Sequence, residues 1–185
     1  ADGNNPAEKD ADGSVEKNGM TCYDKLNTKF YKIREDAMRY LLENEVLAVS
    51  IDSLGAEVKS VKRKSDGFEF MWQGDPKYWG RTSPVLFPFV GVPKNKQYRY
   101  EGKNYPMGQH GFARDMEFEL EDQADGCIWF VLKSDDGTYA KYPFAFRLHI
   151  GYELLDSEVK VLWKVENADS KPMYFSIGAH PAFRC

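Results

Sequence analysis

This sequence of 185 residues has no long hydrophobic run, no large excess of charge of one sign and few cysteines. No apolar stretch approaches the roughly 20 residues that a membrane-spanning helix needs, so we expect no membrane span. The formal net charge of −4 provides no basic surface for nucleic acid, so we expect no nucleic-acid partner. The motifs GxGxxG, GxxxxGKS/T and GxSxG are absent, which argues against the dinucleotide-binding, P-loop and serine-hydrolase classes that need them.

Cysteine usage argues against a disulfide framework. Cys22, Cys127 and Cys185 are odd in number, far apart in the sequence and in no CxxC pair. We therefore expect reduced thiols, no structural zinc and a cytoplasmic protein. The chain opens on no secretory signal pattern, which fits that expectation.

The first part of the chain differs from the rest in composition. Residues 1–20 are polar and rich in Ala, Asp, Gly, Asn and Lys, which predicts a linker or tail. The apolar residues of 21–42 recur at helical spacing: Leu26, Phe30, Ile33, Ala37 and Leu41. That spacing predicts a helix. We interpret 1–37 as an extension of unassigned role, partly helical, that precedes a domain over 38–185.

From about Glu45 onward, apolar and polar residues alternate. Residues 144–154 (FAFRLHIGYEL) and 158–167 (EVKVLWKVEN) show the period of two that marks half-buried strands. Asp-Gly pairs at 66–67, 125–126 and 136–137 mark turns between such runs. Roughly ten short strands at this spacing predict an all-β fold, an antiparallel β-sandwich.

Three histidines are available for proton transfer near neutral pH: His110, His149 and His180. His149 lies in a predicted strand beside Arg147 and Glu153, and we interpret it as a surface or inter-sheet residue. His110 precedes a glycine at the entrance to a strand, and His180 precedes a proline at the exit of one. Loops at strand ends often form pockets. Composition alone leaves two interpretations of these two residues open, a functional pair or simple hydrogen-bonding residues.

Aromatic residues are plentiful at 15%, and residues 71–91 (MWQGDPKYWGRTSPVLFPFVG) are the most aromatic loop. Pro84 and Pro88 exclude a central, fully paired strand here. The segment is either a rigid loop packed on the sandwich or the wall of a ligand site, with Arg81 as its polar anchor. Flat aromatic rings suit the second role, because they stack on the faces of sugars.

Five blocks occur in a characteristic order: LGAEVKSV, MWQGDPKYWGRTSPVLFPFVG, YRYEGKNYPMGQHGFARD, YPFAFRLHIGYEL and VENADSKPMYFSIGAHPAF. With HGFAR and GAHPAF as its most specific parts, this order resembles the aldose 1-epimerase (galactose mutarotase-like) family over residues 38–185. The LacX-type branch is the most similar. GRTSPVLFP and HGFAR are also similar, more weakly, to the hexose-6-phosphate epimerases.

The resemblance implies a galactose mutarotase-like supersandwich, of which 38–185 form the N-terminal part. It also implies an isomerase of carbohydrate metabolism that interconverts the α and β anomers of a free aldose. This reaction needs a base for the proton of the anomeric hydroxyl and an acid for the ring oxygen. By motif order, His180 matches the family's acid, and His110 matches the histidine that hydrogen-bonds the substrate. The implied partner is a small sugar, with no cofactor and no metal.

One substrate-binding position departs from the family pattern. Many relatives carry an arginine directly after the glycine of the FPxVG block, where this chain has Val92. Arg81 or Arg114 would then supply the guanidinium, and Trp72 and Trp79 the aromatic wall. Because arginines near these blocks serve the phosphate in the sugar-phosphate branch, a phosphorylated sugar is an alternative substrate.

The family's catalytic base is a glutamate past the HPAF block, and no glutamate of this chain lies in a matching motif. The resemblance therefore implies a second chain or a further C-terminal segment that completes the sandwich. Without it, apolar faces and strand edges stay open. A non-catalytic carbohydrate-binding protein of the same fold is the alternative from a different class. Val92 and the absent glutamate favour this alternative, whereas the histidine pair favours an enzyme.

Overall fold

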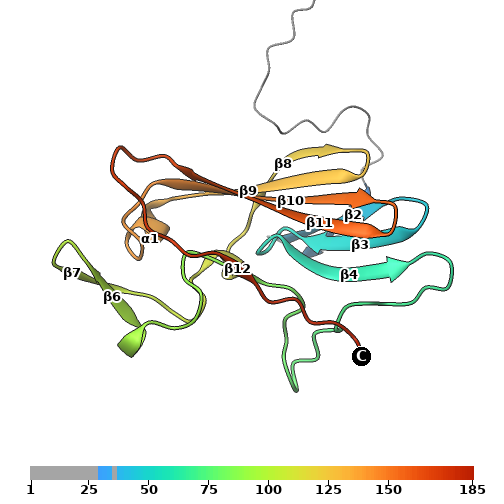
Figure 1. Ribbon diagram of the computed structural model, residues 1–185, viewed down its shortest axis with the longest axis horizontal. Coiled ribbons are helices and arrows are strands. Elements are labelled where there is room, and N and C mark those ends of the chain that lie inside the picture. The colour runs from blue at the N-terminus through green and yellow to red at the C-terminus, as the bar shows by residue number, and fades with distance from the viewer. Residues whose placement is uncertain (1–28, 35–36) are drawn as a thin grey trace, which may run out of the picture.

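The computed structural model describes residues 29–34 and 37–185, with side chains from residue 38 onward, and its regular structure is almost entirely antiparallel β-sheet (Figure 1). The described strands are β1 (Lys29–Arg34), β2 (Ala37–Glu43), β3 (Leu47–Asp52), β4 (Glu57–Arg63), β5 (Val85–Leu86), β6 (Gln97–Tyr100), β7 (Lys103–Pro106), β8 (Glu119–Ala124), β9 (Cys127–Lys133), β10 (Phe146–Leu155), β11 (Glu158–Asn167) and β12 (Gly178–Ala179). Short helical turns lie between them: η1 (Lys94–Lys96), η2 (Ala113–Asp115) and α1 (Asp136–Tyr139). The predicted all-β class is confirmed.

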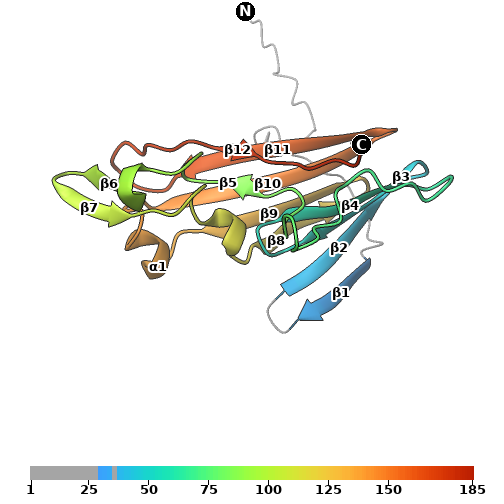
Figure 2. The same ribbon diagram turned by 90° about the horizontal axis from the view of Figure 1, so that it is seen from below.

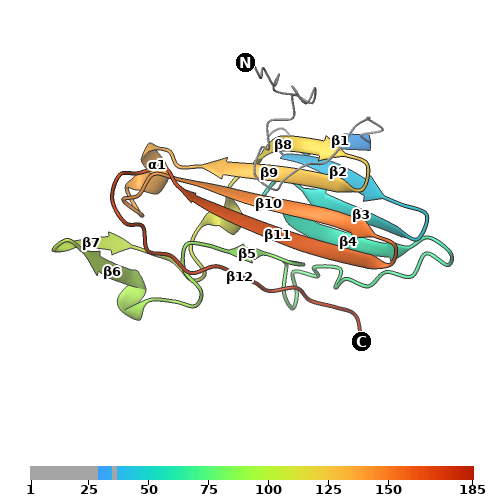
Figure 3. The same ribbon diagram turned by 45° about the horizontal axis from the view of Figure 1, so that its top comes forward.

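Two four-stranded antiparallel sheets form the body of the molecule, in the orders β1-β2-β3-β4 and β11-β10-β9-β8. The second sheet lies over the first, and its end near α1 extends beyond it (Figures 2 and 3). Between them, the rings of Tyr40 and Phe130 meet edge to face, with centroids 5.2 Å apart. The hydroxyl of Tyr152 donates to the carbonyl oxygen of Ala56 at 2.6 Å, which joins β10 to the start of β4. The core therefore lies between the sheets, as in a β-sandwich.

The alternation predicted for 144–154 is present in β10. Its core-facing residues are all buried: Phe146, Leu148, Ile150, Tyr152 and Leu154. On its opposite face Arg147 is exposed, as alternation predicts, but His149 and Gly151 are buried. Gly151 provides the room for the indole of Trp129 on β9, because a Cβ at 151 would lie 2.6 Å from that ring.

The helix predicted over 21–42 is wrong wherever the structure describes this segment. Residues 29–34 and 37–43 are the antiparallel strands β1 and β2, and β2 also pairs with β3. The apolar positions fit the helical period of 3.6, but pairing with the neighbouring strands of the sheet decides the structure of this segment. Residues 1–28 lie outside the described residues, so the interpretation of 1–37 as an extension stays a prediction.

Two short pairings hold the loop of residues 71–91, one to the C-terminal segment and one to the HGFAR block. β5 pairs with β12, with Val85 opposite Ala179 (Figure 3). Phe87 and Gly111 form a parallel bridge, in which the Phe87 carbonyl accepts the N–H groups of Phe112 and Ala113 at 3.0 and 3.1 Å. The aromatic loop, the HGFAR block and the GAHPAF block therefore meet at one place.

The prediction of reduced thiols is wrong for one of the cysteines. Cys127 is disulfide-bonded, whereas Cys185 is free and exposed. Separation along the sequence was a poor guide here, because a fold can bring distant residues together. Within the described ranges, no helix has the length and hydropathy that crossing a bilayer requires.

Candidate functional site

The backbone of His180 pairs with the aromatic loop of residues 71–91, which holds this residue in place. It directly follows β12, and its N–H donates to the carbonyl oxygen of Pro84 at 3.1 Å. Two residues further on, the N–H of Ala182 donates to the Thr82 carbonyl at 2.9 Å. The backbone of this segment is therefore fixed on the aromatic loop, while the His180 side chain is exposed.

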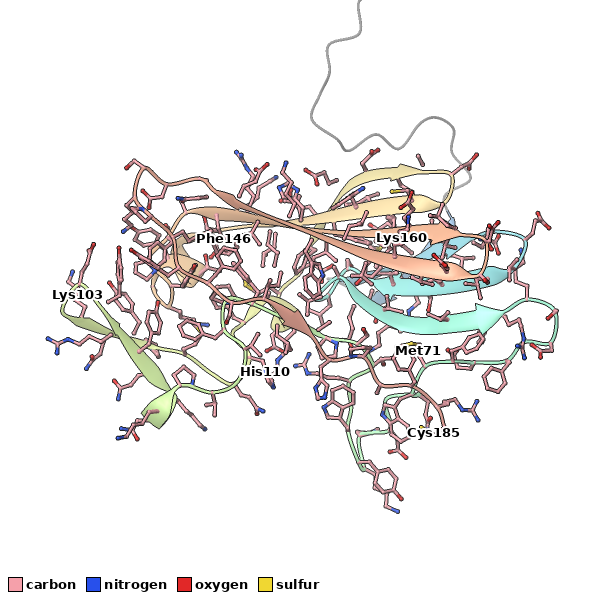
Figure 4. The ribbon with its side chains drawn as sticks, in the orientation of Figure 1. Met71, Lys103, His110, Phe146, Lys160 and Cys185 are labelled. Carbon is pink, nitrogen blue, oxygen red and sulfur yellow. The ribbon has the colours of Figure 1, made fainter. Side chains whose placement is uncertain are left out.

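His110 is held by a second set of backbone contacts, in the loop layer below the strands (Figure 4). Its backbone has a φ of +66°, and its N–H donates to the Gly91 carbonyl at 2.7 Å. The Gly91 N–H donates in return to Nδ1 of the His110 ring at 3.0 Å. Gly111 follows with a φ of +72°, and a Cβ there would lie 2.1 Å from the Phe87 carbonyl oxygen, so the turn requires glycine.

These contacts determine the tautomer of His110. Because Nδ1 accepts the Gly91 N–H, the proton of the neutral ring is on Nε2. The side-chain nitrogen of Gln109 lies 3.2 Å from Nε2, and a flip of that amide, which exchanges its oxygen and nitrogen, places the oxygen where it accepts this proton. Burial lowers the pKa of His110, and the nearby Arg114 and His180 lower it further. The arrangement favours a neutral ring that presents Nε2–H as a hydrogen-bond donor.

The structure brings the two predicted histidines together. The ring centroids of His110 and His180 lie 6.4 Å apart, although the residues come from separate blocks. The indole of Trp79 also lies near His180, with its centroid 4.9 Å from that of the imidazole. Within the described part of the chain, no carboxylate hydrogen-bonds to either of these imidazoles, and no group of three or more His, Cys, Asp or Glu residues is arranged to hold a metal ion.

Trp72 stabilises the segments that carry Trp79 and His180. Its indole N–H donates to the carbonyl oxygen of Trp79 at 2.9 Å, and its own backbone N–H donates to Ala182 at the same distance. Its ring contacts Tyr78 edge to face, with centroids 6.3 Å apart. Of the two predicted tryptophans, Trp79 contacts His180, and Trp72 fixes the loop that carries Trp79.

The two predicted arginines lie together and bind protein groups. Arg81 forms an ion pair with Asp115 and donates to the Arg114 carbonyl at 3.2 Å. Arg114 donates to the Gln109 carbonyl at 2.8 Å, and its buried Nε makes no hydrogen bond among the described residues. Burial lowers the pKa of Arg114, as does Arg81, whereas Asp115 opposes this effect. Arg114 thus fixes the residue next to His110.

Three supporting residues were not identified from the sequence. Gly91 and Gln109 orient the His110 ring, as described above. Glu57 is 5% exposed, and its carboxylate accepts the N–H groups of Thr82 and Ser83 at 2.6 and 2.9 Å. The one sequence signal for Glu57 is an acidic residue at the start of an apolar strand. Together with Arg81 and with Trp79, which contacts His180, it lines a hollow of about 650 Å³.

Val92 is exposed and directly follows Gly91, the partner of His110. An arginine at this position would therefore extend from the turn that holds the His110 ring. This chain places a short apolar side chain there instead, and the guanidinium that binds beside His110 is that of Arg114, on the Gln109 carbonyl.

Comparison with known proteins agrees with this arrangement. A model of the aldose 1-epimerase family matches residues 38–185. The chromosomal and plasmid LacX proteins of Lactococcus lactis subsp. lactis are each 36% identical over 150 residues, which are 78% of this chain and 50% of theirs. The chain thus spans about half the length of the curated relatives it matches.

Solved structures show the same similarity. A galactose mutarotase related enzyme from Lactobacillus acidophilus superposes with a TM-score of 0.79 at 43% identity, covering 80% of this chain and 49% of that one. A galactose mutarotase-like protein from Lactobacillus casei ATCC 334 gives a TM-score of 0.76 at 41% identity, covering 78% and 49%. The resemblance carried by the sequence blocks is confirmed, and the chain belongs to the aldose 1-epimerase family.

Proposed function

We propose that this chain carries the acid and a substrate-positioning residue of a mutarotase that interconverts the α and β anomers of a free aldose. The observation that supports this most is the pairing of His110 and His180, 6.4 Å apart at ring centroids, beside the Trp79 indole. The site is formed from the two blocks that are most specific to the family. Its side chains can donate protons and stack on a sugar, as anomer exchange requires.

In the proposed reaction, a base removes the proton of the O1 hydroxyl and the C1–O1 bond becomes a carbonyl. The bond from C1 to the ring oxygen breaks, and the ring oxygen takes a proton from the His180 imidazolium. Rotation about the C1–C2 bond and the reverse steps then give the other anomer, which returns both protons. The His180 ring is exposed and has no hydrogen-bond partner among the described residues, so it is free to meet the ring oxygen.

His110 has a different role in this proposal. Its Nδ1 is occupied by Gly91, and its Nε2–H points away from that contact. A sugar hydroxyl that displaces the exposed Gln109 side-chain amide from Nε2 is oriented by this fixed, neutral donor without exchange of the ring proton. The Trp79 ring next to His180 offers a face for the apolar side of the sugar.

The base is proposed to be a carboxylate that residues 38–185 do not supply, as the resemblance implies. The alternative of a non-catalytic sugar-binding protein is favoured by one observation, since neither imidazole has a carboxylate partner among the described residues. The sugar-phosphate alternative is less favoured, because Asp115 already neutralises Arg81 and the Arg114 side chain binds the Gln109 carbonyl.

The test combines sugar binding with mutarotation in the whole protein. Polarimetry would follow α-glucose and α-galactose and their 6-phosphates, and NMR would follow the imidazole resonances on titration with sugar. We expect His180→Ala to lower the catalysed rate by about 10²–10⁴-fold, the usual contribution of a general acid, with little loss of binding. His149→Gln is the control histidine, because it lies away from the pair and should keep the rate.

An unchanged rate in His180→Ala would refute the assignment of the acid. Sugar binding without mutarotation in the unaltered protein would establish the non-catalytic alternative. A preference for the 6-phosphates that is lost in Arg81→Gln would establish the sugar-phosphate alternative.

A further inference from the structure

A second hollow, of about 560 Å³, lies at the end of the molecule where Figures 1 and 2 show α1 and the β6–β7 hairpin. Its lining comes from three segments of the chain and includes Lys96, Met107, Phe112, Met116, Thr138 and Lys141. Neither histidine of the pair lines it, and it shares only Asp115 with the hollow that Trp79 lines. The second hollow is therefore a separate cavity, and its volume suits a small organic molecule.

The floor of the second hollow is apolar and belongs to the packed core. Met107 and Phe112 are 3% and 8% exposed, and Met116 packs against the same core while remaining partly open. The ring of Phe112 contacts that of Tyr142 edge to face, with centroids 6.4 Å apart. Methionine side chains adapt to ligands of different shape, and an aromatic ring offers a flat face. This floor can therefore hold the apolar part of a ligand.

Hydrogen bonds fix the walls of the second hollow relative to each other. The N–H of Met107 donates to the Lys96 carbonyl at 2.9 Å, which joins the two ends of the β6–β7 hairpin. The hydroxyl of Tyr98, on β6, donates to the Lys141 carbonyl at 2.9 Å, which joins this hairpin to the segment that follows α1. The two segments that carry the lysines are therefore held in place before any ligand binds, as is usual for small-molecule sites.

The charges available to a ligand in the second hollow are positive. Lys96 and Lys141 are exposed, and neither has a carboxylate within ion-pair distance in the described part of the chain. The two carboxylates of the lining already have partners. Asp115 forms the ion pair with an arginine described above, and Asp135 accepts the N–H of Thr138 at 2.7 Å. An anionic group would therefore meet two ammonium groups that no protein carboxylate neutralises.

An apolar floor beside two unpaired lysines matches one class of ligand. We propose that the second hollow is a binding site for a small organic anion, an apolar ring or chain that carries a carboxylate or phosphate group. The apolar part contacts Met107, Phe112 and Met116, and the anionic group binds Lys96 and Lys141. An ammonium group acts as a point charge, so it binds either kind of anion.

The proposed anion site shares one short turn with His110. Gly111 and Phe112 line the second hollow, and the N–H of Phe112 donates to the Phe87 carbonyl at 3.0 Å. His110 directly precedes these two residues, so a ligand that rests on Phe112 contacts the turn that carries the His110 ring. The inference concerns binding of an anion and does not rest on the proposed mutarotase activity.

The experiment titrates the protein with three probes of similar shape: phenyl phosphate, phenylacetate and the neutral 2-phenylethanol. NMR of the methionine methyl groups reports binding at Met107 and Met116. We expect at least one of the two anions to bind, and the neutral probe to bind at least about fivefold more weakly, because it cannot pair with the lysines. The anion with the higher affinity identifies the group, phosphate or carboxylate, that the site prefers.

A double variant tests the lysines directly. In Lys96→Gln, Lys141→Gln, the dissociation constant of the anionic probes should rise at least about fivefold, because both ammonium groups are lost. The matched control is Lys94→Gln, Lys103→Gln. It removes the same charge from exposed residues of the same hairpin region that do not line the second hollow, and it should keep the affinity.

Several results would overturn the proposal. Equal losses of affinity in the two double variants would show a general attraction of anions to a basic surface. Equal affinity for the neutral probe and the anions, or no binding of either anion at millimolar concentrations, would show that the lysines form no anion site. Perturbation of the His110 and His180 imidazole resonances without any shift at Met107 and Met116 would place the probes at the histidine pair instead. Loss of mutarotation alone would leave the methionine shifts intact, so failure of the proposed function is distinguishable from failure of this inference.

Discussion

Replacing Gly111 by alanine tests the backbone geometry on which the site depends. Gly111 has a φ of +72°, and the new Cβ would lie 2.1 Å from the carbonyl oxygen of Phe87. The left-handed conformation costs a residue with a Cβ about 1–2 kcal/mol. Moving the Phe87 backbone out of the contact costs a further ~1–3 kcal/mol, as overpacking does elsewhere. The expected loss of unfolding free energy is therefore about 2–5 kcal/mol.

Gly67 offers a control with almost the same backbone. Its φ is +71°, and a Cβ there meets nothing within 4 Å. Gly67→Ala should lose only the unfolding free energy that the left-handed conformation costs, about 1–2 kcal/mol. The gain from restricting the unfolded chain is common to both variants and cancels in their difference. Since 1 kcal/mol shifts the melting temperature of a chain of this size by roughly 2–4 °C, Gly111→Ala should melt about 2–12 °C below Gly67→Ala.

Thermal unfolding followed by circular dichroism measures the difference. NMR adds a local readout, because displacement of the turn should break the bond from Gly91 N–H to the His110 ring in Gly111→Ala but not in Gly67→Ala. Equal melting temperatures for the two variants would refute the close approach of Gly111 to Phe87. An intact Gly91–His110 bond in Gly111→Ala would refute the link between this turn and the histidine.

Two further predictions concern stability. The hydrogen bond from Lys164, with a smaller contribution from His149, lowers the pKa of Glu166 from 4.5 to about 2, so its ionised form adds stability above pH 4.5 that is lost as the pH falls toward 2. Urea titrations at pH 6, 4 and 3 measure the free energy of unfolding of the unaltered chain and of Glu166→Gln. The excess free energy of the unaltered chain should become smaller at each lower pH, and a constant difference would contradict this. Tyr152→Phe removes the 2.6 Å hydrogen bond to the Ala56 carbonyl and leaves that acceptor buried, which should cost about 1–3 kcal/mol of unfolding free energy. A cost near zero in the same titrations would show that this bond does not stabilise the sandwich.

The parts of the fold that follow local periodicity could be predicted. The alternation of β10 identified its buried face, because a strand half-covered by another sheet separates apolar from polar positions. Alternation failed on the opposite face, where His149 is 4% exposed with Nδ1 2.6 Å from a carboxylate oxygen of Glu121. The burial of His149 depends on side chains of neighbouring strands. The residues next to His149 in the sequence carry no information about those side chains.

The candidate site was only partly predictable for a similar reason. Its histidines stand in specific blocks, so His110 and His180 could be named, and the structure brings them together. The residues that orient them act largely through backbone groups. Gly91 uses its N–H and C=O, which every residue other than proline possesses, and nothing in its side chain marks that use. Glu57 was missed because its partners lie 25 and 26 positions away.

The contact between Trp129 and Gly151 limits how this sheet can change over evolutionary time. The indole occupies the space that any side chain at 151 would need, since even a Cβ would come within 2.6 Å of it. A larger residue at 151 is tolerated only if a smaller one has already replaced Trp129, and loss of Trp129 alone leaves a void on the sheet. Positions 129 and 151 are therefore expected to vary together, because a substitution at one is tolerated only with a suitable residue at the other.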